Sequence, residues 1–237
     1  YSLIGVSIVW GGVFLFYDLQ KARIYTTVIP LFDIYILKKV ALTSMPLGIT
    51  LMLFSISTNM PRYFLERMYG EEMLGYFTAL SYIVVAGTTV VSSVGQAISP
   101  RLAKFYANNQ EGQFKKLIRQ LIFIGATLGI GGVIFSLLFG KWFLSFFYQP
   151  SYSDYSYLFV ILMVLGMLDY MANFIGYGLT ASKKYKQQQY VSLVCLVVSV
   201  LLCSLLIKQY ELVGAGVALI GSSGLRLILQ YILLFRK

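Results

Sequence analysis

The stretch that decides the fold is Gln120–Gly140, QLIFIGATLGIGGVIFSLLFG, which runs for 21 residues without a charged side chain. As an α-helix it would be about 32 Å long, enough to cross the hydrocarbon core of a bilayer. Main-chain N–H and C=O groups cannot be left bare in hydrocarbon, so such a segment has to be a helix that pairs them internally. Gly125 and Gly129 within it form a GxxxG pair, which indicates close packing against a neighbouring helix, with a hinge as the alternative.

The same apolar pattern recurs on both sides of this stretch. Apolar residues make up 58% of the 237 positions and charged residues only 12%, whereas a soluble domain carries about 25% charged residues. The sequence therefore predicts an all-α, polytopic membrane bundle of about seven transmembrane helices. We expect these helices at 1–17, 42–60, 74–99, 120–140, 157–180, 190–207 and 213–235.

Lysine and arginine test this segmentation independently. Alternate connections contain 14 and 4 of the 19 cations, and the remaining one, Arg226, lies inside a predicted helix. The positive-inside rule places the cation-rich connections, and the C-terminus with them, in the cytoplasm. We therefore expect a multi-pass protein of the cytoplasmic (inner) membrane.

The connection 18–41 divides the chain. Its apolar part Ile24–Leu37 contains Pro30 and Asp33 and is short for a span, so we interpret it as a cytoplasmic or interfacial linker between two halves of a larger protein. On this interpretation, 1–17 is the truncated last helix of an N-terminal half, and 42–237 is a six-helix C-terminal half. The chain begins with Tyr1, which also leads us to expect that a preceding part is missing.

Several functions are excluded by composition. A net charge of +10 is typical of a membrane protein with cytoplasmic cations facing lipid headgroups, and no basic helix stands clear of the apolar segments to bind nucleic acid. The chain has no histidine, which removes histidine metal sites and Ser-His-Asp catalysis. Cys195 and Cys203 would lie about 12 Å apart on one helix, too far for a disulfide. We predict no enzyme, no catalytic residue, no metal site and no cofactor.

Polar residues inside the predicted spans are the functional candidates, because burying them in a membrane is costly. Asp169 and Asn173 share one helix face and either line an aqueous cavity or lie in a helix seam. Asp169 could bind an ion, carry a proton or pair with Arg226. Arg226 either snorkels to the cytoplasmic end of its helix or faces a cavity and recognises an anion. Gln96 adds polar surface to the helix 74–99.

Asn59 and Arg62 flank Pro61 at the predicted outer end of the helix 42–60. Arg62 either forms an i,i+4 surface pair with Glu66 or lies at the mouth of a cavity, where its guanidinium would suit a phosphate. Both interpretations remain open at this stage.

An ordered series of short motifs resembles the Wzx-type polysaccharide flippases of the multidrug/oligosaccharidyl-lipid/polysaccharide exporter superfamily. Each motif is short and apolar, and their order and spacing make the match specific. The motifs are MPLGI at Met45–Ile49, NMPRYFLE at Asn59–Glu66, LGYF at Leu74–Phe77, SPRLA at Ser99–Ala103 and GAGVA at Gly214–Ala218.

This resemblance implies one six-helix lobe of a two-lobed transporter, with Asn59 and Arg62 lining the outer part of a central cavity. It implies that lipid-linked oligosaccharide is the substrate, with membrane lipids around the protein. Undecaprenyl-pyrophosphate-linked repeat units would cross the membrane by alternating access, for capsule or O-antigen synthesis. Coupling to H⁺ or Na⁺ is left open. The alternatives are a cation-coupled multidrug exporter of the same superfamily, a lipid-II flippase, and a membrane glycosyltransferase, for which the connections are too short.

Overall fold

The computed structural model describes residues 2–13, 33–148 and 150–236, and it divides the chain into two units, 1–43 and 44–237. The smaller unit contains helix α1 (Ser2–Val13) and the first turns of α3 (Ile34–Ala107). Asp33 precedes α3 and accepts a hydrogen bond from the main-chain N–H of Tyr35 at 2.8 Å, as an N-terminal cap does. The helix thus begins inside the predicted 18–41 linker. Most of that linker lies outside the described residues, so the proposed domain division stays a prediction.

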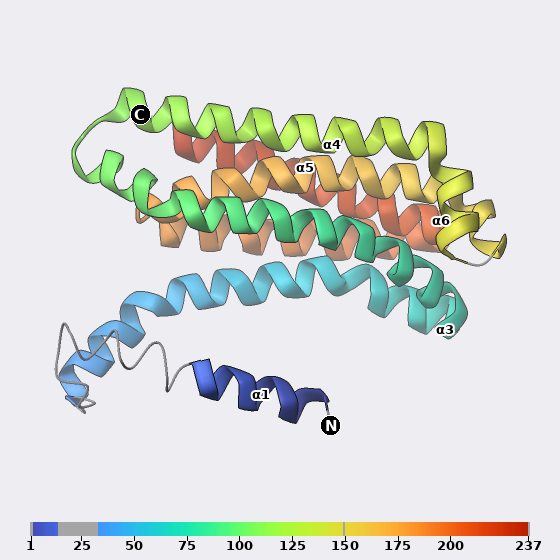
Figure 1. Ribbon diagram of the computed structural model, residues 1–237, viewed down its shortest axis with the longest axis horizontal. Coiled ribbons are helices and arrows are strands. Elements are labelled where there is room, and N and C mark those ends of the chain that lie inside the picture. Colours follow the sequence, from blue (N-terminus) through green and yellow to red (C-terminus); the bar gives the residue numbers. More distant parts are fainter. Residues whose placement is uncertain (1, 14–32, 149, 237) are drawn as a thin grey trace. The chain divides into compact units, whose positions relative to one another are not determined.

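The larger unit is a bundle of long helices (Figure 1). It contains the rest of α3, then α4 (Glu111–Phe147), the short 3₁₀ helix η2 (Pro150–Tyr155), α5 (Ser156–Ala181) and α6 (Tyr185–Phe235). Four of these helices are long and apolar enough to cross a membrane, and the described residues form no strand. The predicted all-α membrane bundle is therefore confirmed.

Two of the helices are interrupted by a residue whose backbone is not helical. Gly70 in α3 has φ 82° and Glu211 in α6 has φ 49°, and the chain reverses at these points. Each helix therefore has two arms, 34–69 and 71–107 in α3 and 185–210 and 212–235 in α6. With α4 and α5, the larger unit has six membrane-length arms, which correspond to the six complete spans predicted from the sequence.

The helices extend further than their apolar segments, so the non-helical connections are shorter than the sequence predicted. The segments 61–73 and 100–107 are helical apart from Gly70, and Pro46, Pro61 and Pro100 all lie inside α3. A helix does not have to end where its apolar run ends, because its main-chain hydrogen bonds continue into the headgroup region. Proline is tolerated where a neighbouring group satisfies the carbonyl that it leaves free.

Pro61 illustrates how that carbonyl is used. Proline has no N–H, so the carbonyl of Ser57 lacks its partner four residues on. The hydroxyl of Ser199 on α6 donates to this carbonyl at 3.1 Å. At the second kink, the hydroxyl of Tyr69 donates to the carbonyl of Ile207 at 3.1 Å, four residues before Glu211. Both irregularities of the backbone therefore tie α3 to α6.

Helix α5 is packed against α3 through two tyrosines. Tyr170 donates to the carbonyl of Val84 and Tyr177 to that of Ser92, each at 3.2 Å. The rings lie over Gly87 and Gly95 of α3, where any Cβ would overlap them. The two contacts fix how α5 is rotated about its axis.

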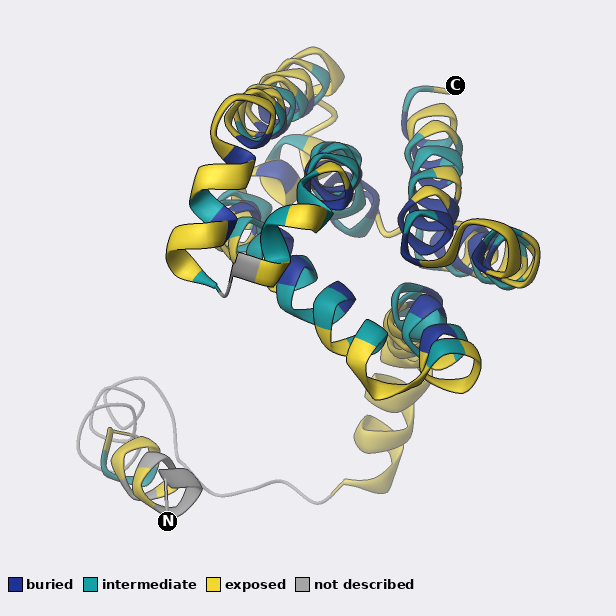
Figure 2. Ribbon diagram, turned by 90° about the vertical axis from the view of Figure 1, so that its right-hand side faces the viewer, coloured by how far each residue is buried: buried dark blue, intermediate teal, exposed yellow. Residues whose placement is uncertain are grey.

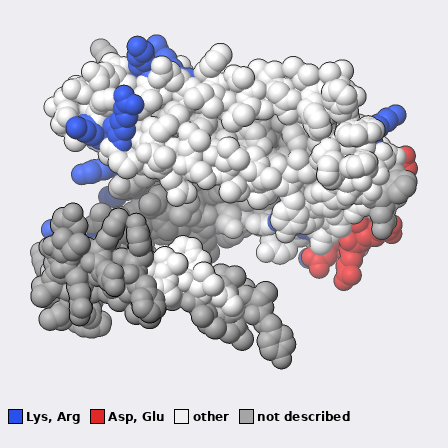
Figure 3. All heavy atoms as spheres, in the orientation of Figure 1, with Lys and Arg blue, Asp and Glu red and all other residues white. Residues whose placement is uncertain are grey.

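Burial and charge are distributed as a membrane location requires. Buried side chains face the helix contacts, while the outward faces are exposed and apolar (Figure 2), as at Leu138 and Phe146 of α4. Figure 3 shows most of the Lys and Arg on the face in view at one end of the bundle, with Asp, Glu and a few further cations toward the opposite end. This separation is what the positive-inside alternation predicts.

The topology can be tested by labelling single cysteines. We expect Cys at Lys116 and Lys186 to react with a membrane-impermeant maleimide only from the cytoplasmic side, and Cys at Lys141 and Lys208 only from outside. All four side chains are exposed, and the native Cys195 and Cys203 are buried, which keeps the background low. Reaction of Lys116→Cys and Lys186→Cys from opposite sides would contradict the helix count.

The α4–α5 contact offers a matched pair of glycines. A Cβ at Gly129 would overlap the backbone and side chain of Met167, whereas a Cβ at Gly131, two residues away on the same helix, has open space. Gly129→Ala should therefore destabilise the bundle by about 1–3 kcal/mol, as overpacking does. Gly131→Ala should leave the thermal unfolding midpoint in detergent unchanged or slightly higher. Equal midpoints for the two variants would show that the close packing at Gly129 is not needed.

Candidate functional site

Two adjoining cavities lie in the larger unit, with volumes of about 740 Å³ and about 280 Å³. Both arms of α3, helix α5 and α6 form their walls. Neutral hydrogen-bonding side chains predominate in the larger cavity, whereas apolar and polar side chains line the smaller one in similar numbers. The larger cavity is lined by, among others, Thr50, Thr88, Ser92, Gln96, Ser99, Asn173, Tyr177, Thr180, Gln188, Ser192, Arg226 and Gln230.

The two cavities follow one another along the bundle. On the first arm of α3, residues 47–54 line the larger cavity and 54–62 the smaller one. On α5 the residue order is reversed, as for a helix that runs in the opposite direction: residues 162–173 line the smaller cavity and 172–180 the larger one. Phe54, Thr88 and Asn173 belong to both. Residues 47–62 of an α-helix extend over about 22 Å, so the two cavities, together called the polar path below, extend along most of a membrane's hydrocarbon thickness.

An ion pair lies where the two cavities meet. Nη2 of Arg226 donates to Oδ1 of Asp169 at 2.9 Å, with side-chain exposures of 7% and 15%. Asp169 lines the smaller cavity and Arg226 the larger one. The guanidinium carbon also lies 4.3 Å from the centre of the Phe54 ring, a favourable cation–π contact. The structure thus brings Asp169 and Arg226 together and turns Arg226 into the cavity, not toward the helix end.

The ion pair makes the buried charge of Arg226 tolerable but does not use all hydrogen-bond donors of its guanidinium. An unpaired guanidinium at this depth would be very costly, and a carboxylate partner removes most of that cost. Among the described residues, Nε of Arg226 and Oε1 of Gln230, one turn further along α6, are buried without a hydrogen-bond partner. A donor and an acceptor therefore have no partner within the described part of the protein.

A second polar pair lines the smaller cavity, toward the other end of the path. Nη1 of Arg62 donates to Oδ1 of Asn59 at 2.8 Å, and Nδ2 of Asn59 donates to the carbonyl of Ser55 at 2.8 Å. The alternative Arg62–Glu66 pair does not form, because Arg62 turns back along α3 while Glu66 is exposed. The Nε of Arg62 is buried and unpaired.

All six candidate residues from the sequence line this path, and their roles stay predictions. Gln96 lines the larger cavity, Asn59 and Arg62 the smaller one, and the other three lie around the junction. The sequence analysis missed Gln188 and Gln230. Gln230 follows Arg226 by four residues on the same helix face, a spacing that could have indicated it. Gln188 lies in a run of three glutamines after the lysine-rich turn, and only folding shows which of them faces inward.

Fold and site together define a class of protein. A multi-pass helical membrane bundle with a polar path across it is the architecture of a transporter lobe. The comparisons agree: residues 46–205 match the MatE family, and the chain belongs to this family. MatE is a family of transporters of the multidrug/oligosaccharidyl-lipid/polysaccharide exporter superfamily, not of enzymes.

Among curated proteins, the chain is similar to the capsular polysaccharide biosynthesis protein CapF of Staphylococcus aureus. The two are 32% identical over 195 residues, which cover 82% of this chain and 49% of CapF. The chain therefore spans about half the length of this relative. No solved structure gives a significant match.

The ion pair can be tested by a double-mutant cycle in the full-length protein. Asp169→Asn or Arg226→Gln alone leaves a charge without its partner and should cost up to about 3 kcal/mol of stability. The double variant leaves no unpaired charge and should lose clearly less than the sum of the two single losses. Thermal unfolding in detergent measures all three variants. Strict additivity would show that the two side chains are not coupled.

Proposed function

We propose that the full-length protein is a flippase that moves undecaprenyl-pyrophosphate-linked oligosaccharide repeat units across the cytoplasmic membrane for capsule or other surface polysaccharide synthesis. The observation that carries the proposal is the polar path with a buried arginine at its midpoint. Membership of the MatE family and the similarity to a capsular polysaccharide biosynthesis protein support a role in polysaccharide transport.

The chemistry of the path matches the two polar parts of such a substrate. A glycan requires many neutral donors and acceptors, which the amides of Gln96, Asn173, Gln188 and Gln230 supply. Tyr177, which also lines the larger cavity, offers an aromatic ring. A pyrophosphate requires cations, and a guanidinium binds phosphate oxygens in a bidentate manner. The polyprenyl tail can stay in the bilayer, so only the polar part needs the cavity.

Asp169 and Arg226 would act as an exchangeable pair. In the empty cavity the carboxylate compensates the guanidinium, and an arriving pyrophosphate would compete for the same donors. The Nε of Arg226 has no partner among the residues that the structure describes, so a phosphate that displaces Asp169 would accept hydrogen bonds from Nε and Nη2 together. Arg62, with its own unpaired Nε, would receive the headgroup toward the outer end. We further propose that transport is coupled to H⁺ or Na⁺, with Asp169 binding the cation. The C-terminus would lie in the cytoplasm.

These roles can be tested by deleting the gene in its own cells and complementing the deletion with the full-length protein or its variants. Deletion of the gene should trap lipid-linked repeat units on the cytoplasmic leaflet and abolish surface polysaccharide. When the deletion strain is complemented with Arg62→Ala or Asp169→Asn, surface polysaccharide normalised to the level of the protein should fall about 10-fold or more, because each change removes a polar contact along the substrate path. Quantitative lipid and polysaccharide analysis gives the measurement.

Two exposed residues supply matched controls. Arg67→Ala removes an arginine five residues from Arg62 but outside the cavities, and Asp154→Asn removes an exposed aspartate of η2. Both should restore export fully. Normal export in Arg62→Ala and Asp169→Asn would reject the site. Normal polysaccharide in the deletion strain, together with increased sensitivity to cationic drugs, would favour a multidrug exporter. Loss of lipid II translocation instead would identify a lipid-II flippase.

A further inference from the structure

A second hollow lies on the outer surface of the larger unit, where α3 ends and α4 begins. It consists of two adjoining depressions of about 750 Å³ and about 420 Å³ that share Lys116, Leu117 and Gln120. No residue that lines it lines the polar path. We refer to it as the α4 groove; its further lining residues are Ile98, Arg101, Phe105, Gly112, Gln113, Lys115, Arg119, Leu121, Phe123 and Ile124.

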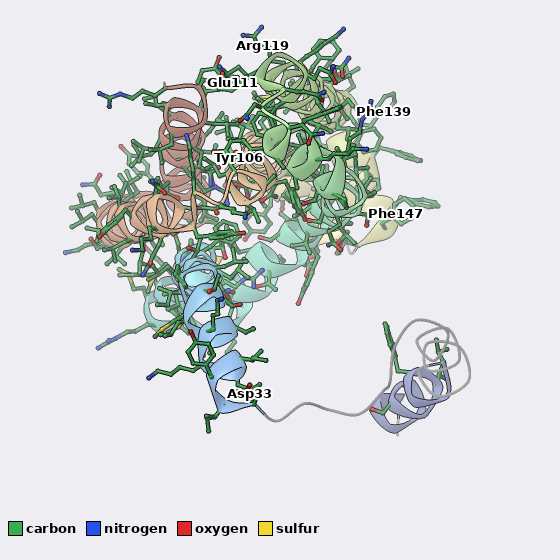
Figure 4. The ribbon with its side chains drawn as sticks, turned by 90° about the vertical axis from the view of Figure 1, so that its left-hand side faces the viewer. Asp33, Tyr106, Glu111, Arg119, Phe139 and Phe147 are labelled. Atoms are coloured by element: carbon green, nitrogen blue, oxygen red, sulfur yellow. The ribbon has the colours of Figure 1, made fainter. Side chains whose placement is uncertain are left out.

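The part of the α4 groove beside the end of α3 and the first turns of α4 is strongly cationic. Among the described residues that line it, four are basic and none is acidic: Arg101, Lys115, Lys116 and Arg119. Lys115 is paired with Glu111 at 3.0 Å, which leaves three cations without a carboxylate in the groove. Glu111 and Arg119 both lie on the first turns of α4 (Figure 4).

Aromatic rings hold two of these cations in place. The guanidinium carbon of Arg101 lies 5.4 Å from the centre of the Phe105 ring, and that of Arg119 lies 5.9 Å from the Phe235 ring. Arg101 belongs to α3, Lys116 and Arg119 belong to α4, and Phe235 ends α6. An anion in the groove would therefore bridge α3 and α4 beside the end of α6.

The part of the α4 groove further along α4 is apolar and open. Ile98, Leu121, Phe123 and Ile124 line it, and the side chain of Phe123 is 73% exposed. Phe123 follows Lys116 by seven residues, which places it about 10 Å further along the helix, toward the middle of the membrane. Cationic and apolar parts thus follow one another in the direction in which a bilayer lipid lies.

We propose that the α4 groove is a binding site for an anionic phospholipid. Its phosphate lies between Lys116, Arg119 and Arg101, and an acyl chain lies along Phe123 and Ile124. Basic pockets on the cytoplasmic side of membrane helices suit anionic headgroups, and each cation near the membrane surface contributes about five-fold to affinity. A free phosphate would use the cations but leave the apolar part empty, and a zwitterionic lipid would fill the apolar part without net attraction. The site is independent of the flippase proposal.

The test uses the full-length protein, purified in detergent, with lipid binding counted by native mass spectrometry. Dioleoylphosphatidylglycerol is titrated against the parent and against Lys116→Gln/Arg119→Gln, and its affinity should fall roughly 30-fold in the variant. Lys141→Gln/Lys208→Gln removes the same charge outside the groove and should bind like the parent. Phe123→Gln, which keeps every cation, should weaken phosphatidylglycerol binding but not phosphate binding.

Three further measurements distinguish the ligand. Dioleoylphosphatidylcholine has the same chains without net charge and should bind far more weakly than phosphatidylglycerol. Inorganic phosphate should compete poorly, and phosphatidylglycerol should raise the thermal unfolding midpoint of the parent but not that of Lys116→Gln/Arg119→Gln. Equal losses in both double variants, equal binding of the two lipids, or full competition by phosphate would overturn the proposal. Tighter groove-dependent binding of a polyprenyl diphosphate would assign the groove to substrate and overturn it as well.

Discussion

Main-chain hydrogen bonding at membrane depth is the constraint on which the rest of this structure depends. Unbroken helices satisfy it, and each departure from a helix requires a donor from elsewhere. Pro61 leaves the carbonyl of Ser57 without its helical donor, and the hydroxyl of Ser199 donates to it instead. The hydroxyl of Tyr69 likewise donates to the carbonyl of Ile207 beside the kink of α6. The contacts that repair the backbone are therefore also contacts between helices, and they hold the walls of the polar path.

The position of the ion pair follows from the packing of α5. Tyr170 and Tyr177 insert above Gly87 and Gly95 of α3 and donate to α3 carbonyls. Asp169, next to Tyr170, is thereby turned toward Arg226 of α6. A charge that would be costly in hydrocarbon becomes tolerable because a carboxylate, the Phe54 ring and a polar cavity surround it. Such a pair can persist in a membrane, and under the proposed function a ligand phosphate would take the place of the carboxylate.

The basic residues of the larger unit act in two different environments. Arg226 is buried, compensated and directed into the path, whereas Lys116 and Arg119 are exposed and have no carboxylate in their groove. The first arrangement suits a ligand that enters and leaves, because binding replaces an existing partner. The second suits a resident anion, because an uncompensated cation cluster gains from constant neutralisation.

The sequence by itself determined the helical membrane class, the six long arms of the larger unit and the separation of charge between their ends. These features depend only on run length, hydrophobicity and the order of cations along the chain, which are local properties. Asp169 and Arg226 could likewise be selected, since charges in apolar spans are costly and rare. Only the tertiary structure decided that these two side chains form a pair, that Arg62 pairs with Asn59 instead of Glu66, and that Gln188 and Gln230 face the cavity. Those outcomes depend on how each helix is rotated and kinked against its neighbours, and that rotation is set by contacts between residues far apart in the chain, such as Tyr170 with Gly87 and Ser199 with Ser57.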